Sequence, residues 1–122
     1  MLLHVPKVLT KTQLREIRKI VDHANWADGS ITAGTQSAKA KKNFQLPEDG
    51  LDSQKARAIV LEALAGNAEF LTGALPKKIY PPLFNKYEGA SNRFGNHIDN
   101  AVRTHAASGK HVRTDISCTL FL

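Results

Sequence analysis

The feature of this chain that most constrains its fold is a change in hydrophobic period near Pro76. Before Pro76, apolar residues recur in two segments at the spacing of a helix face. After it, apolar and polar residues alternate, which is the period of a strand with one buried face. The sequence therefore predicts an α+β protein, with a helical region over residues 1–76 and a β region over residues 77–122.

The first region carries a signal for a helix start. Thr10 and Gln13 fit a capping box, in which each side chain satisfies a free backbone donor at the start of a helix. Apolar residues follow at helical spacing up to Ala24. We therefore expect a helix over residues 11–24, with Trp26 packed on it.

A second helix is expected to start at a cap formed by Asp52 or Ser53 and to end near Gly66. A short helical turn is expected over residues 69–74, because Pro76 cannot continue a helix.

The second region has three stretches that alternate like strands, at residues 83–87, 95–100 and 112–122. In the first stretch, Asn85 and Tyr87 share a face. In the last, Cys118 falls on an apolar face and is expected in the core. Because no turn or helix stop precedes Leu122, we expect a chain truncated there, with open strand edges.

Composition narrows the class of protein. Hydrophobic residues make up 42% and charged residues 23% of the 122 residues, which is ordinary for one globular domain. No apolar run approaches the roughly 18 residues that span a bilayer, and no signal peptide is evident. The single cysteine excludes an internal disulfide, so we expect a cytoplasmic protein.

The net charge of +6 raises the question of an anionic partner. The densest basic cluster is Lys39, Lys41 and Lys42, in a stretch over residues 30–43 that reads as a loop or irregular strand. No aromatic residues are interleaved with these lysines, as a base-stacking surface requires. We therefore expect a solvated face there and no binding of nucleic acid, with a salt-dependent nucleic-acid binder as the weaker alternative.

The clearest candidate for chemistry is the pair His97 and Asp99. In an extended segment both side chains point to one face and Ile98 points to the other. An imidazole and a carboxylate placed together supply two of the three protein ligands of a 2-His-1-carboxylate Fe(II) site. The same tripeptide also occurs by chance on protein surfaces, so a solvated pair is the alternative.

No third ligand is evident from the sequence. His105 and His111 flank a loop after the pair and could approach the metal, although such loop histidines are usually solvated. His4 and His23 lie in the helical region and are expected to be structural or exposed. No phosphate loop, nucleophile elbow or zinc-type cysteine pair competes with the metal hypothesis.

Five segments stand in the same order as the motifs of a known family. They are Thr32-Ala33-Gly34-Thr35-Gln36, Lys42-Asn43-Phe44-Gln45-Leu46, Pro82-Leu83-Phe84-Asn85-Lys86-Tyr87, Phe94-Gly95-Asn96-His97-Ile98-Asp99-Asn100-Ala101, and Val112-Arg113-Thr114-Asp115-Ile116-Ser117-Cys118-Thr119-Leu120-Phe121-Leu122. In them the chain resembles the PKHD-type hydroxylases. These are bacterial iron(II)- and 2-oxoglutarate-dependent dioxygenases similar to the prolyl 4-hydroxylase branch.

The resemblance implies a double-stranded β-helix, or jelly roll, whose first strands pack on the N-terminal helices. It implies that His97 and Asp99 are the first two iron ligands. It also implies that Tyr87 bonds 2-oxoglutarate, with cross-strand packing as the open alternative for that tyrosine. The third ligand, a histidine, and the arginine that clamps 2-oxoglutarate are expected beyond Leu122, because family members are longer than this chain.

Other polar residues have weaker assignments. Asn100 directly follows the pair and is a candidate for orienting it. Arg103 and Arg113 could meet an anionic substrate, but an ion pair with Asp115 explains Arg113 at least as well.

The implied activity is hydroxylation of an unactivated C–H bond by Fe(II), 2-oxoglutarate and O2, with ascorbate as the reductant that keeps the iron ferrous. The residues do not identify the substrate, whether a small molecule or a protein. The alternative is a non-catalytic remnant or interaction module, whose open strand edges would drive assembly into a homo-oligomer. We expect no membrane partner in either case.

Overall fold

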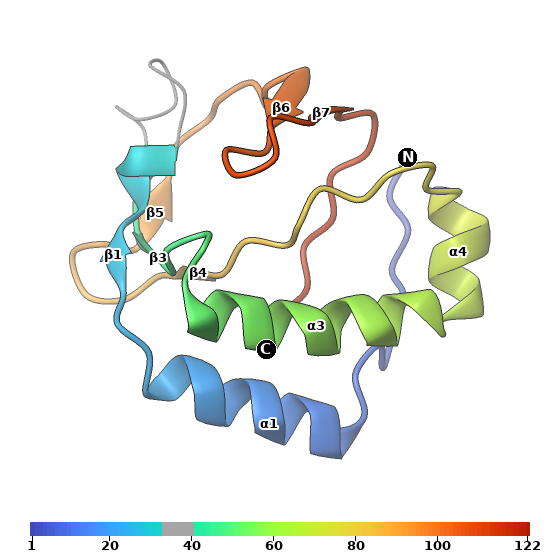
Figure 1. Cartoon of the computed structure of the whole chain (residues 1–122), viewed down its shortest axis with the longest axis horizontal. Helices are drawn as coiled ribbons and strands as arrows, with labels where there is room; N and C mark the ends of the chain where they lie inside the picture. The colour runs from blue at the N-terminus through green and yellow to red at the C-terminus, as the bar shows by residue number, and fades with distance from the viewer. Residues whose placement is uncertain (33–40) are drawn as a thin grey trace.

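The structure, a computed structural model, describes residues 1–32 and 41–122. The helices in these residues are α1 (Lys11–Asp22), α3 (Leu51–Ala65) and α4 (Ala68–Ala74), with a 3₁₀ helix η1 over Gly29–Thr32. The strands are β1 (Ala27–Asp28), β2 (Lys41–Lys42), β3 (Phe44–Gln45), β4 (Asn85–Lys86), β5 (Arg93–Phe94), β6 (Val102–Thr104) and β7 (His111–Arg113). Helices and small antiparallel sheets share one chain, so the predicted α+β class is confirmed (Figure 1).

The start of α1 is the predicted capping box. The Thr10 hydroxyl accepts from the Gln13 backbone N–H at 3.1 Å, and the Gln13 side chain accepts from the Thr10 N–H at 3.0 Å. The helix ends at Asp22, two residues before the predicted end. There the Trp26 indole N–H donates to the carbonyl of Val21 at 3.1 Å, so the predicted packing of Trp26 on this helix is confirmed.

The predicted cap of the second helix is wrong. Gly50 is the residue that precedes α3, and no side chain caps it. The Ser53 hydroxyl instead donates to the carbonyl of Pro47 at 2.7 Å, and Asp52 lies in the first turn. The reason is a turn over Pro47–Gly50, closed by a 3.1 Å backbone hydrogen bond, which starts the helix earlier than the polar residues suggest.

The predicted short helical turn over residues 69–74 is confirmed as α4, which starts one residue earlier. The Asn67 side chain accepts from the Phe70 backbone N–H at 2.8 Å and so satisfies a free donor of the first turn. Leu75 ends the helix in the left-handed conformation, with φ of 45°, directly before Pro76.

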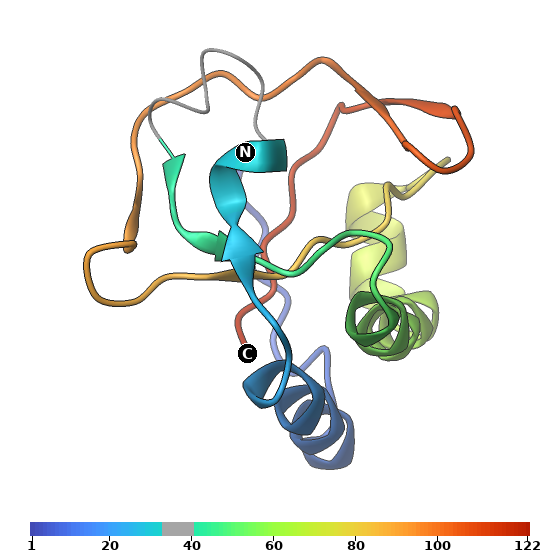
Figure 2. The same ribbon diagram turned by 60° about the vertical axis from the view of Figure 1, so that its left-hand side comes forward.

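The core lies between the two long helices and the strands. α1 and α3 lie side by side and run in opposite directions, and the final segment of the chain returns to them (Figures 1 and 2). Leu120 in that segment packs against the buried cluster. The buried hydrophobic residues of the core are Ile17, Val21, Leu46, Ala56, Val60 and Phe84.

Within residues 1–32 and 41–122, the strands form three small antiparallel sheets. β3 lies between β1 and β4, with Gln45 opposite both Ala27 and Asn85. β2 pairs with β5 and β6 pairs with β7. Within the described residues these sheets do not close into a barrel. The division into residues 1–76 and 77–122 stays a prediction.

The predicted strands are longer than the observed ones. The stretch 83–87 pairs only at Asn85–Lys86, and residues 95–100 and 114–122 form no strand. Of the predicted stretch 112–122, only Val112 and Arg113 belong to a strand, β7, which starts one residue earlier at His111. Alternation gives a segment the side-chain pattern of a strand, but the ladder also needs a neighbouring backbone, and the described residues provide none here. Cys118 is consequently exposed rather than in the core.

The prediction of a solvated basic cluster is wrong for one of its lysines. Lys42 is exposed, but only 8% of Lys41 is accessible to solvent. Strand β2 turns alternate side chains to opposite faces, so the two neighbours cannot share one environment. Lys39 and most of the Thr32–Gln36 motif lie outside the described residues.

Among residues 1–32 and 41–122, no helix combines the length and the apolar character that a bilayer crossing requires.

Candidate metal centre

The predicted pair meets in space. Strand β5 ends at Phe94, and the loop that follows brings His97 Nε2 to 3.0 Å from Asp99 Oδ1. The two residues thus face the same side although their segment is not a strand. The His97 side chain is 26% exposed and that of Asp99 is 66% exposed, so the pair lies at the surface with the imidazole partly covered.

The second ring nitrogen of His97 determines how the pair can function. Nδ1 lies 2.8 Å from the carbonyl oxygen of Gly95, and a carbonyl only accepts, so Nδ1 carries the proton. In the neutral ring, Nε2 then presents a lone pair to a carboxylate oxygen. Two acceptors at this distance require a cation between them, either a second proton on the ring or a metal ion.

The residues present fit a metal ion. Adjacent ligands of an octahedral ion, with bonds of about 2.1 Å, lie roughly 3 Å apart, which is the separation of His97 Nε2 and Asp99 Oδ1. A metal-bound histidine almost always donates its other ring N–H to a carboxylate, carbonyl or water, as His97 does to Gly95. A neutral imidazole with a carboxylate suits Fe(II).

Phe94 fixes the plane of the imidazole. Its ring stacks on that of His97 with a centroid separation of 3.7 Å and an interplanar angle of 16°. The Lys41 ammonium lies 5.4 Å from the centroid of the Phe94 ring. The ring of His97 is therefore held by the hydrogen bond to Gly95, by the contact with Asp99 and by one aromatic face.

The other histidines of the β region do not join the pair. His105 Nδ1 is hydrogen-bonded to the Ser108 hydroxyl at 2.9 Å, and His111 Nδ1 to the Thr104 hydroxyl at 2.8 Å. Nowhere in residues 1–32 and 41–122 do three histidine, cysteine, aspartate or glutamate side chains gather as a metal site would require. The structure supports neither histidine as the third ligand.

The remaining candidates are dispersed. Tyr87 follows β4 and is 47% exposed. Arg113 forms the expected ion pair with Asp115, at 2.8 Å. The Asn100 carbonyl accepts from the Thr114 hydroxyl, which ties the segment after the pair to the residues after β7. The assignment of Asn100 and Tyr87 to the site stays a prediction.

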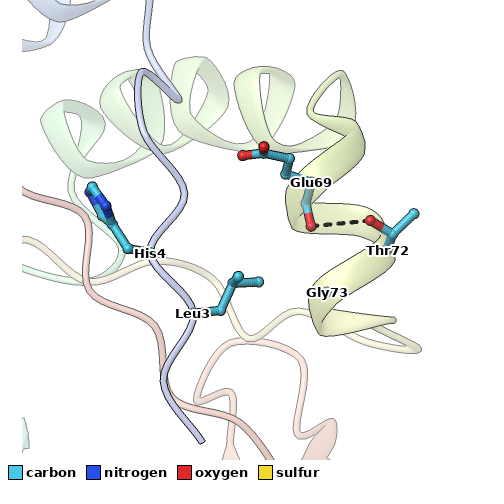
Figure 3. Close-up of a pocket in the computed structure, with 5 residues that line it drawn as sticks. All are labelled: Leu3, His4, Glu69, Thr72 and Gly73. Carbon is cyan, nitrogen blue, oxygen red and sulfur yellow. Dashed lines mark hydrogen bonds between the residues drawn. The ribbon is translucent and has the colours of Figure 1, made fainter.

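The histidines of the helical region are exposed, as expected. His23 follows α1 and its Nδ1 is hydrogen-bonded to the Lys19 carbonyl at 2.9 Å. His4 lines a hollow between the N-terminal segment and α4, drawn in Figure 3. There Leu3 packs so closely that a Cβ on Gly73 would lie 2.3 Å from its Cδ2, and the Thr72 hydroxyl donates to backbone carbonyls of its own helix. This hollow is a packing contact.

The structure also shows a row of buried polar side chains that the sequence interpretation missed. Lys41, Asn43 and Gln45 alternate along β2 and β3, and their exposed fractions are 8%, 3% and 1%. The Lys41 ammonium donates to Gln45 Oε1 at 3.0 Å, and the Asn43 amide donates to Asn85 Oδ1 at 3.1 Å. The sequence does place polar residues at every second position here, at Lys41, Asn43 and Gln45. The solvent-exposed face of a strand has the same pattern, so the spacing alone did not identify these residues as buried.

Burial lowers the pKa of the Lys41 ammonium, the nearby positive charge of Arg103 lowers it further, and the Asp28 carboxylate acts in the opposite direction. Arg103 lies with its guanidinium carbon 4.6 Å from the centroid of the Tyr80 ring. The Tyr80 hydroxyl donates to Glu48 Oε1 at 2.5 Å. Burial, followed by that hydrogen bond, raises the pKa of Tyr80.

No family model matches the chain. Curated bacterial proteins match all of it. Three of them are named PKHD-type hydroxylase. The protein of Xanthomonas campestris pv. campestris strain B100 is 55% identical over 124 residues, and that of Variovorax paradoxus is 55% identical over 122 residues. The protein of Janthinobacterium sp. strain Marseille is 50% identical over 122 residues. The match covers 54% of each of these relatives, so the chain spans about half the length of the curated relatives it matches. Over its full length the chain is thus similar to the N-terminal half of proteins named PKHD-type hydroxylase, at 50–55% identity.

Proposed function

We propose that the chain is the N-terminal part of an Fe(II)- and 2-oxoglutarate-dependent hydroxylase, with His97 and Asp99 as two iron ligands. One observation carries the proposal: Nε2 of His97 lies 3.0 Å from Oδ1 of Asp99 while Nδ1 is hydrogen-bonded to the Gly95 carbonyl. The names of the homologues support an oxidoreductase that hydroxylates.

When bound, iron with 2-oxoglutarate and O2 supplies the oxidation of an unactivated C–H bond. The chain's own residues provide the binding site. The Gly95 carbonyl keeps the proton on Nδ1 of His97 and so leaves Nε2 free to bind. Asp99 contributes a negative charge that offsets part of the charge of a divalent ion. Phe94 covers one face of the imidazole and excludes water from it.

The rest of the site belongs, in this proposal, to the length of the relatives that the chain does not span. That part would supply the third histidine ligand and the arginine that clamps 2-oxoglutarate, and it would complete a jelly roll around these strands. The exposed Tyr87 is proposed to donate its hydroxyl to 2-oxoglutarate. Ascorbate is proposed as the reductant, and the cytoplasm, a reducing compartment, as the location.

The test is metal binding by the 122-residue chain, with Mn(II) as a paramagnetic stand-in for Fe(II). We expect substoichiometric Mn(II) to broaden the NMR signals of residues 95–100 first. His97→Ala should weaken this binding by about tenfold or more, because it removes one of two ligands. His111→Ala is the matched control, since it removes an exposed histidine away from the pair, and it should leave the broadening unchanged. Equal broadening in the His97→Ala variant would overturn the assignment.

A non-catalytic interaction module is the alternative that one observation favours. Several large apolar side chains are exposed, among them Ile98 and Phe121, each at 88%. Such side chains suit association with another chain. The two proposals differ in turnover: consumption of 2-oxoglutarate with formation of succinate by the purified chain, lost in the His97→Ala variant, would exclude the non-catalytic alternative.

A further inference from the structure

The inference concerns the hairpin formed by β6 and β7, which follows the candidate metal centre in the chain. No aspartate or glutamate lies in residues 101–114. The basic side chains of that stretch are Arg103, His105, Lys110, His111 and Arg113. The hairpin is therefore a short two-stranded ribbon whose charges all have one sign.

One face of the hairpin packs on the rest of the molecule. The Arg103 guanidinium carbon lies 4.6 Å from the centroid of the Tyr80 ring, and the His105 ring meets the same ring edge-on at 6.3 Å. Val112, the cross-strand partner of Arg103, is partly buried. The strand residues of the other face are all exposed: Val102, Thr104, His111 and Arg113.

The outer edge of β7 is open. Within residues 1–32 and 41–122, β6 and β7 form a sheet without a third strand. The Thr114 N–H donates to the Ala101 carbonyl at 2.9 Å, so it points toward β6. Because N–H groups alternate in direction along a strand, that of Val112 also points toward β6, whereas those of His111 and Arg113 point outward. β7 therefore presents backbone groups with which another strand can pair.

The charges decide which strand fits this edge. Lys110 directly precedes β7 and Arg113 ends it, and both side chains are exposed. A second copy of the hairpin would bring the same positive charges against them, so charge opposes pairing between copies. A nucleic acid has no backbone that pairs with a strand edge, and residues 101–114 include no tryptophan, tyrosine or phenylalanine for a base to stack on. The occupant that fits is an extended peptide with acidic side chains.

The ion pair between Arg113 and Asp115 leaves Arg113 available to such a peptide. The two side chains are 79% and 63% exposed, and an ion pair in water contributes little free energy. A carboxylate on the peptide can therefore take the place of Asp115.

The hairpin is attached directly to the candidate metal centre. Val102 is the third residue after Asp99, so their Cα atoms lie at most about 11 Å apart. Arg113 is the cross-strand partner of Val102, and the Thr114 hydroxyl donates to the Asn100 carbonyl at the base of the hairpin. Because an extended peptide rises about 3.3 Å per residue, one bound at Arg113 spans the way to the centre in about five residues or fewer.

We propose that the open edge of β7 binds an acidic segment of a protein substrate and so places a nearby residue of that segment at the His97–Asp99 centre. The acidic side chains pair with Lys110 and Arg113, and the backbone of the segment pairs with β7. The proposal names the substrate class of the proposed function and rests on that function for the identity of the centre. Binding of the segment itself requires no metal.

The test uses the metal-free 122-residue chain and three probes. The first is a peptide of about ten residues in which pairs of glutamates alternate with pairs of threonines, so that both faces of the extended peptide carry acids. The second has glutamine in place of glutamate, and the third is a thymidylate oligonucleotide of the same length. We expect only the acidic peptide to bind, and to bind more weakly as salt rises.

Amide hydrogen exchange followed by NMR locates the bound peptide. At saturation, the acidic peptide should slow the exchange of the His111 and Arg113 N–H groups by about tenfold or more, because these point outward and gain a partner. The Val112 N–H already points toward β6, so its exchange should change by less than about twofold.

Variants separate this edge from general attraction to a basic protein. The double variant Lys110→Gln, Arg113→Gln should weaken binding of the acidic peptide by about tenfold or more. The matched control is Arg18→Gln, Lys19→Gln, which removes one arginine and one lysine from the exposed face of α1, where Arg18 also forms an exposed ion pair. This control should change the affinity by less than about twofold. Arg113→Gln alone, expected to weaken binding about threefold, serves if the double variant does not fold.

Four results would each overturn the proposal. They are no binding of the acidic peptide, equal weakening by the hairpin and α1 variants, binding without slower exchange at His111 and Arg113, and binding of the oligonucleotide as tight as that of the acidic peptide. If Mn(II) fails to bind at the pair while the peptide still binds at β7, only the proposed function is overturned. If Mn(II) binds and the peptide does not, only this inference fails.

Discussion

At the scale of single residues, chemistry depends on what surrounds a side chain more than on its type. His97 has the spacing to Asp99 that a metal pair needs, but the Gly95 carbonyl and the Phe94 ring are what direct its Nε2 to the carboxylate. Lys41 and Lys42 are adjacent and identical in type, yet one is buried and the other exposed. The alternation of a strand produces this difference.

The side chain of Lys41 should lose its proton at a lower pH than an exposed lysine does. Its pKa is lowered, first by burial and then by Arg103, so the unfolded chain binds the proton more tightly than the folded one. The free energy of unfolding should therefore rise with pH from the lowered pKa up to the ordinary lysine value, as the buried charge is lost. A ¹³Cε NMR titration, assigned with Lys41→Met, measures the pKa directly.

Chemical denaturation at several pH values provides the second measurement. The stability that Lys41→Met gains over the wild type should be largest at neutral pH. This gain should shrink as the pH rises from the lowered pKa of Lys41 to the ordinary lysine value. A stability difference that is constant over that window would contradict the prediction.

At the scale of elements, the start of α1 could be predicted because its capping groups are side chains. The capping box of α1 is visible in the sequence because Thr10 and Gln13 make it. The start of α3 is set by a backbone turn ending at Gly50, which leaves no such signal. Alternation of polar and apolar residues indicated where strands could lie, but it did not predict their length. Each observed strand pairs over only two or three residues.

Thr10→Ala should test the contribution of the capping box to α1. The substitution removes the acceptor of the Gln13 N–H, and we expect a loss of about 1 kcal/mol in the free energy of unfolding. Thr12→Ala is the control, because Thr12 is exposed within the helix and alanine favours helix formation. Chemical denaturation followed by circular dichroism measures both. An equal loss in the two variants would mean that the cap is not the cause.

At the scale of the whole molecule, one small core joins the helical region to the β region. Ile17 and Val60 come from the two long helices, whereas Phe84 and Leu120 come from the second part of the chain. Residues far apart in sequence therefore meet to form this core.

Ile17→Ala should show how much that core contributes. Ile17 is fully buried between the helices, so the substitution leaves a cavity and should cost about 2–5 kcal/mol. Ile116→Ala makes the same chemical change at a side chain that is 59% exposed, and it should cost less than about 0.5 kcal/mol. Equilibrium denaturation measures the difference between the two variants, and equal costs would place the core elsewhere.

The sequence by itself determined the α+β class, the capping box of α1, the approximate positions of three helices and the meeting of His97 with Asp99, because these depend on local spacing and side-chain type. Only the tertiary structure decided that Lys41 is buried, that Cys118 is exposed, that His105 and His111 are bonded elsewhere, and that the long predicted strands pair over short ladders. Each of these depends on which distant backbone or side chain lies alongside, and alternation along one segment carries no information about its neighbour in space.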